Sequence, residues 1–119
     1  MADDKQQFDL SYLNQVFQGN RALVIQIVEL FLQQVPAYVR MMENHLSEGN
    51  YAAIYPLAHK SKSPCSMLGL KGIENLLIEI ESNGKAGKFE NLATMIQSLS
   101  DQLNLCIADL KAYLEAQEK

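Results

Sequence analysis

The sequence has few of the side chains that bind metals. Its 119 residues include two histidines, His45 and His59, and two cysteines, Cys65 and Cys106, which do not form a C-x-x-C pair. A structural zinc site needs four such ligands at regular spacings. The Glu-x-x-His pairs of di-iron helical bundles are also missing. We therefore expect no metal and no resident cofactor, and we expect both cysteines to be reduced core thiols.

Positive charge and long apolar segments are also scarce. Ten lysines and arginines stand against 14 acidic residues, a net charge of −4, and the pI is near 5.1. Nucleic-acid-binding domains usually carry a basic face. The longest apolar segment, residues 22–28, contains Gln26, whereas a membrane-spanning helix needs about 20 apolar residues. Residues 1–5 lack the features of a signal peptide. These absences predict a cytoplasmic protein that binds neither nucleic acid nor a membrane.

Helical periodicity dominates the rest of the sequence. Apolar residues recur three and four positions apart, with no convincing strand alternation and no internal repeat. Caps and breaks predict a short helix over residues 10–18 and four longer helices over residues 21–48, 51–68, 71–82 and 89–116. We expect a kink before Pro36 and another before Pro64, because proline removes a helical hydrogen bond.

These helices predict an all-α fold. Four amphipathic helices joined by short loops favour an up-down antiparallel four-helix bundle, with the short extra N-terminal helix covering one end. The length and the absence of a linker predict a single domain over residues 1–119. We expect this domain to be a monomer.

The helix predicted over residues 51–68 carries a histidine on its outer side. At 100° per residue, one face of this helix collects apolar and small residues and is the predicted core face. These residues are Ile54, Leu57, Ala58, Ser61, Cys65 and Leu68. His59 lies roughly 150° away from them, beside Tyr55, Lys62, Ser63 and Ser66. Exposure alone is equally typical of an ordinary surface histidine.

The neighbours of His59 favour phosphoryl chemistry. An accessible imidazole is partly neutral at cellular pH and offers a nucleophilic nitrogen. Lys62, one turn later, can offset the charge of a phosphoryl group on that nitrogen. Ser63 and Ser66 are small, so a partner surface can approach the ring. No Walker-type loop or kinase signature occurs, so we expect a phosphocarrier, not an enzyme, and no autophosphorylation from ATP.

Residues 58–70, AHKSKSPCSMLGL, resemble the A-H-x-L-K-G-S-x-x-x-L-G signature of histidine-containing phosphotransfer (HPt) domains. The likeness extends to F-L-x-x-x-P at residues 31–36, L-x-x-G-N at residues 46–50 and I-E-x-x-G-K at residues 80–85. Members of this family carry their histidine on a four-helix bundle. They relay phosphoryl groups between receiver-domain aspartates in the multistep phosphorelays of two-component signal transduction.

The resemblance implies roles for individual residues. His59 takes the phosphoryl group on its ε-nitrogen and Lys62 stabilises it. Ser63 replaces the usual glycine that leaves room for a docked receiver, and Gly69 ends the histidine helix so that the chain can turn.

Two further pairs of positions are candidates by the same resemblance. Glu81 and Lys85 stand where many relatives carry a polar and a basic residue facing the histidine, and the alternative for them is a solvated helix end. Tyr12 and Val16 share a face of the first helix that no core position claims. Receivers dock on apolar residues near this end, so Tyr12, Val16 and Leu23 are candidate docking residues, the alternative being additional core contact.

The implied partners are receiver domains of response regulators, including that of a hybrid histidine kinase, with Mg²⁺ bound by the receiver. The initiating methionine and the absence of a linker favour a free-standing protein over a domain cut from a sensor kinase.

The competing function is a non-catalytic helical adaptor that docks receivers without phosphotransfer. Two departures from the family pattern support it. Ser61 replaces a leucine, and we expect its hydroxyl to bond a carbonyl one turn earlier. Pro64 replaces a serine, and we expect it to distort the helix after His59 and to tilt His59 relative to Lys62.

Overall fold

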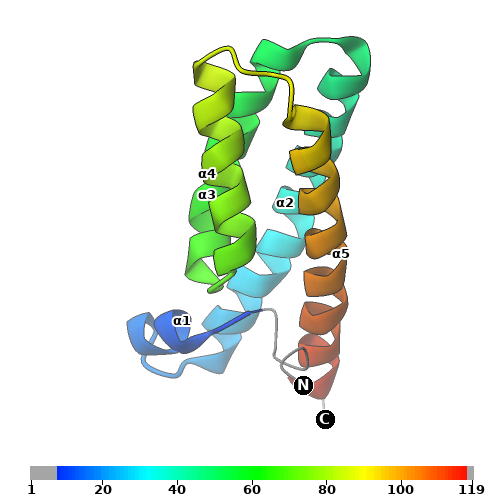
Figure 1. Cartoon of the computed structure of the whole chain (residues 1–119). Helices are drawn as coiled ribbons and strands as arrows, with labels where there is room; N and C mark the ends of the chain where they lie inside the picture. The colour runs from blue at the N-terminus through cyan, green and yellow to red at the C-terminus, as the bar shows by residue number, and fades with distance from the viewer. Residues whose placement is uncertain (1–7, 118–119) are drawn as a thin grey trace, which may run out of the picture.

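The computed structural model describes residues 8–117 of the chain. They form α1 (Ser11–Val16), α2 (Arg21–Glu48), the short 3-10 helix η2 (Tyr51–Ala53), α3 (Ile54–Met67), α4 (Lys71–Lys85) and α5 (Leu92–Gln117). Helices α2 to α5 run alternately up and down side by side, and α1 lies at the end where α2 begins and α3 ends (Figure 1). The predicted antiparallel four-helix bundle with an extra N-terminal helix is confirmed. Residues 1–5, in which we expected no signal peptide, lie outside the described residues.

Local chemistry sets the bounds of α2. The Asn20 side chain accepts a hydrogen bond from the Leu23 amide at 3.2 Å, which caps the first turn. Gly49 ends the helix with a φ of 78°, in the left-handed region that glycine tolerates. Both ends agree with the prediction. Helix α2 continues through Pro36 without interruption.

Helix α4 is longer than predicted. We expected Ser82, Asn83 and Gly84 to end it, but it continues to Lys85. The prediction is wrong because Gly84 is buried in the contact between α4 and α3, where a missing side chain serves packing and not helix termination. Helix α5, by contrast, starts later than predicted: its first residue is Leu92, three residues after the expected start.

The core fills the space between the four long helices. The predicted core face of α3 is confirmed, because all six of its residues are buried and its apolar members belong to one cluster with residues of α2, α4 and α5. Cys65 and Cys106 are both buried and free. Burial raises the pKa of each thiol to about 12, so both thiols stay protonated and unreactive at neutral pH.

Among the described helices, α2 alone is long and apolar enough to cross a membrane by length and composition. Core helices of soluble proteins meet the same criterion. In this fold α2 contributes six buried residues to the core: Val24, Val28, Phe31, Val35, Val39 and Met42.

The segment that leads into α1 is tied to the turn after α3. The Asp9 amide donates to the Leu68 carbonyl at 2.8 Å. Gly69 has a φ of 69°, and a Cβ at this position would lie 2.6 Å from Cβ of Asp9, so only glycine fits here. Leu13 is buried on the inner face of α1. Helix α1 is therefore held against the end of α3.

Candidate functional site

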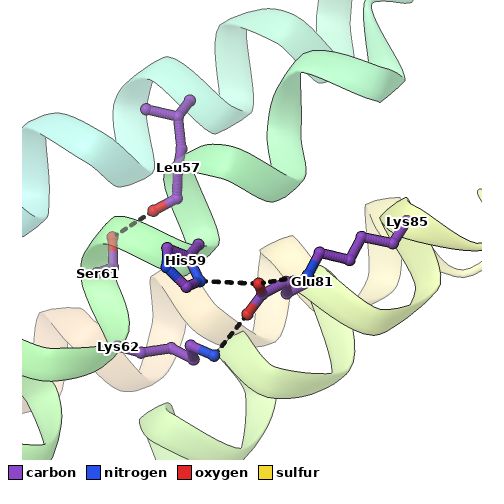
Figure 2. A network of polar contacts seen from close by, with 6 residues as sticks. All are labelled: Leu57, His59, Ser61, Lys62, Glu81 and Lys85. Carbon is purple, nitrogen blue, oxygen red and sulfur yellow. Dashed lines mark hydrogen bonds and ion pairs between the residues drawn. The ribbon is translucent and has the colours of Figure 1, made fainter.

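His59 stands on the outer face of α3, where periodicity placed it. Its side chain is 65% exposed, and Nδ1 lies 2.8 Å from Oε2 of Glu81 on α4. The two residues are 22 positions apart in the chain, and the α3–α4 pairing brings them together (Figure 2). Among the described hydrogen bonds, the ring takes part through Nδ1, and none involves Nε2.

Glu81 is the centre of the site. Its side chain is 9% exposed; Oε1 lies 2.6 Å from Nζ of Lys62, and Oε2 lies 3.3 Å from Nζ of Lys85 as well as bonding His59. The hydrogen bond from Lys62 lowers the pKa of Glu81 to about 2 against the effect of burial, with further bonds from His59 and Lys85 contributing. Glu81 is thus an ionised carboxylate at neutral pH.

The charge of Glu81 fixes the role of the imidazole. A carboxylate can only accept hydrogen bonds, so Nδ1 of His59 must carry a proton and donate it to Oε2. In a neutral ring the lone pair then resides on Nε2. The geometry presents an exposed imidazole whose carboxylate partner also binds two ammonium groups.

The helices position these side chains by simple spacings. Lys62 follows His59 by three residues on α3, and Lys85 follows Glu81 by four on α4, so each pair shares a helix face. Helix α3 runs through Pro64 to Met67, and His59 and Lys62 still reach the same carboxylate. The hydroxyl of Ser61, buried in the core, donates to the Leu57 carbonyl at 2.9 Å, as expected.

Two adjoining hollows line the outer side of α3. The one next to His59 is lined by Lys62, Ser63, Ser66, Glu74 and Ile78. The second extends to α1 and is lined by Asp9, Ser11, Tyr12, Gln15, Ser63, Ser66, Met67, Gly69 and Lys71. Because Ser63 and Ser66 line both, the two hollows adjoin on α3 between His59 and Tyr12. We call the two hollows together the α3 groove.

Of the three predicted docking residues, one lines this groove. Tyr12 lines it and is 55% exposed. Val16 and Leu23 are exposed as well, but they line neither hollow. Glu74 and Ile78 also line the groove, and neither was predicted from the sequence. Their spacing from Glu81, seven and three residues earlier on α4, puts them on its helix face and could have indicated both.

In the part of the chain that the structure describes, residues 8–117, there is no group of three or more His, Cys, Asp or Glu side chains that could hold a metal ion.

Comparison with known proteins identifies the fold and the family. A family model described as the Hpt domain matches residues 26–115. The structure is similar to the crystal structure of histidine-containing phosphotransfer protein B (HptB) from Pseudomonas aeruginosa PAO1, with a TM-score of 0.79 and 17% sequence identity over 95% of this chain and 96% of that one. At this identity the structural likeness concerns the fold. No curated protein sequence matches the chain. Because the family model covers well over half of the sequence, this chain belongs to the Hpt domain family.

Proposed function

We propose that the protein is a phosphoryl carrier in a multistep phosphorelay, with Nε2 of His59 as the acceptor atom. The observation that carries the proposal is the 2.8 Å contact of Nδ1 with the buried carboxylate of Glu81. It leaves the nucleophilic lone pair on the other nitrogen of a ring that is 65% exposed. Membership of the Hpt domain family supports this class of reaction.

The transfer is a substitution at phosphorus. The Nε2 lone pair forms a bond to phosphorus while the bond from phosphorus to the aspartyl oxygen of the donor breaks, and that oxygen leaves with the electron pair. The receiver supplies the aspartyl phosphate and its Mg²⁺, and this chain supplies no cofactor. No proton needs to move, because Nδ1 keeps its proton throughout. Transfer to the next receiver is the same step in reverse, so accurate positioning contributes more than acid–base catalysis.

The side chains around His59 stabilise the phosphorylated ring. A ring with phosphorus on Nε2 and a proton on Nδ1 is cationic, and the Glu81 carboxylate at 2.8 Å offsets that charge. Lys62 is bound to Oε1 in the unphosphorylated protein and lies one turn from His59, so its ammonium can be shared with the phosphoryl oxygens. Lys85 remains as a second cation on Glu81.

We propose the α3 groove as the docking surface for receiver domains. It starts at His59, and Ser63 and Ser66 keep its floor low, so a receiver can bring its aspartate close to the ring. Tyr12 offers an exposed apolar contact at the other end, and Val16 and Leu23 extend the apolar surface on α1 and α2. In this role the chain acts as a cytoplasmic monomer.

The test is phosphotransfer profiling against purified receivers of the same genome. Each receiver is phosphorylated with ³²P and incubated with wild type, His59→Gln and the control His45→Gln. We expect an acid-labile label on wild type and on His45→Gln and none on His59→Gln.

Persistent label on His59→Gln would move the acceptor elsewhere. A receiver that binds the wild-type protein without labelling it, and binds His59→Ala equally well, would favour the adaptor function.

A further inference from the structure

One contact between α3 and α4 is too close for any side chain. A Cβ atom built on Gly84 would lie 2.6 Å from Cβ of Tyr55 and 3.3 Å from its Cγ and Cδ2, whereas ordinary Cβ contacts begin at 3.4 Å. Gly84 is buried in the last turn of α4 and has no positive φ. The reason for a glycine here is therefore the space between the helices and not the backbone conformation.

This contact lies next to the site on both helices. Gly84 follows Glu81 by three residues, and Tyr55 precedes His59 by four, so each is about one turn from its site residue on the same helix face. The hydrogen bond between Glu81 and His59 thus spans the same two helices about one turn away from this contact. A helix is stiff over one turn, so a displacement at Gly84 reaches Glu81.

The distances show that the hydrogen bond between His59 and Glu81 tolerates only a small separation of α3 and α4. Restoring an ordinary contact between a new Cβ on residue 84 and Cβ of Tyr55 requires the helices to separate by about 0.8 Å. A separation of this size directed along the 2.8 Å contact between Nδ1 and Oε2 lengthens it to at most about 3.6 Å, beyond hydrogen-bond distance. Tyr55 cannot avoid this by a rotamer change, because the closest atom is its Cβ.

We propose that Gly84 is a positioning residue: by admitting α4 against Tyr55, it brings Glu81 within hydrogen-bond distance of His59 and so fixes the proton of the ring on Nδ1. Its effect on phosphotransfer rests on the proposed function of His59. The tautomer itself is a property of this chain and needs no receiver.

The test compares three variants of the full chain with wild type by ¹⁵N NMR of the imidazoles, at alkaline pH where the rings are neutral. In wild type, His59 carries its proton on Nδ1. In Gly84→Ala, the shifts of His59 move toward those of the urea-unfolded chain, and phosphotransfer slows by roughly tenfold or more, as expected for a misplacement of about 1 Å.

Gly72→Ala is the matched control. It makes the same change in the same helix, but its new methyl meets only Oε1 of Gln102 at 3.0 Å, the end of a flexible side chain, so His59 keeps its tautomer. The double variant Gly84→Ala/Tyr55→Gly removes the carbon atoms that the new methyl meets and restores the proton to Nδ1.

A folded Gly84→Ala protein with the wild-type tautomer would overturn the inference. So would a Gly84→Ala chain that does not fold, since the glycine would then serve the fold as a whole, and so would a double variant that is not rescued. If Gly84→Ala shifts the tautomer but no receiver labels the wild-type chain, the carrier function is refuted and the role of Gly84 stands.

Discussion

Replacing Glu81 by glutamine removes the charge shared by His59, Lys62 and Lys85 while keeping the shape of the side chain. Two ammonium groups then face a neutral amide that is only 9% exposed, so we expect the folded protein to lose stability. The loss must depend on pH, because it requires that residue 81 of the wild-type protein be ionised. The pKa of Glu81 determines both the size and the sign of this dependence.

The pKa of Glu81 falls from an ordinary 4.5 to about 2 in the fold, which corresponds to at most about 3 kcal/mol. Lys62 and Lys85 are 30% and 61% exposed, and solvent screening reduces the effect to about 1–2 kcal/mol. A carboxyl group whose pKa is lower in the folded than in the unfolded chain stabilises the fold fully at pH values above its pKa in the unfolded chain. The contribution is therefore complete above pH 4.5 and is lost progressively as the pH falls toward 2.

Urea unfolding followed by circular dichroism measures this directly. At pH 7 we expect Glu81→Gln to be about 1–2 kcal/mol less stable than wild type, equivalent to roughly 4–8 °C in the midpoint of thermal unfolding. The difference should shrink between pH 4.5 and pH 2.5. Glu79→Gln, an exposed change on the same helix, should stay within about 0.5 kcal/mol of wild type. A Glu81→Gln difference that is the same at pH 7 and pH 2.5, or one matched by Glu79→Gln, would refute the reasoning.

Two functional predictions follow from the same geometry. Lys62→Met should slow phosphotransfer by roughly 10- to 100-fold, the contribution of one charge-assisted hydrogen bond. The control Lys60→Met removes the same charge from an ammonium that lies 6.0 Å from the Tyr38 ring and should have little effect. Equal slowing in both variants would assign the effect to net charge. Tyr12→Ala should weaken receiver binding by roughly tenfold in titration calorimetry while His59 keeps its wild-type reactivity toward a small phosphodonor. Leu105→Ala on α5, exposed at 60%, should bind normally, and identical affinities of the two variants would exclude Tyr12 from the interface.

The features that periodicity controls were predictable from the sequence. The core face of α3 follows from 3.6 residues per turn, and its opposite side had to carry His59. The bounds of α2 follow from Asn20 and Gly49, whose chemistry caps a helix regardless of tertiary contacts. Such local rules place single side chains on the inside or outside of the bundle.

The pairing of side chains across α3 and α4 was not predictable in the same way. The family resemblance placed Glu81 and Lys85 on the side facing the histidine, but a solvated helix end remained the alternative, because the register of two helices depends on how closely they pack. Gly84 sets that packing, yet the sequence Asn83-Gly84 is equally typical of a helix end. Pro64 is the opposite case. It lies in an unbroken helix, and Lys60, whose carbonyl loses its partner, is exposed to water that can replace the missing hydrogen bond.

The exposure of His59 has a consequence for the pathway as a whole. In the proposed carrier role, a ring with 65% of its side chain open to solvent presents the same atom to every receiver that docks, and a group held there is as available to the donor as to the acceptor. For such a carrier the direction of flow is set by mass action, through the relative amounts of phosphorylated and unphosphorylated receivers. When the signal stops, the phosphoryl groups stored downstream can drain backward through the same nitrogen.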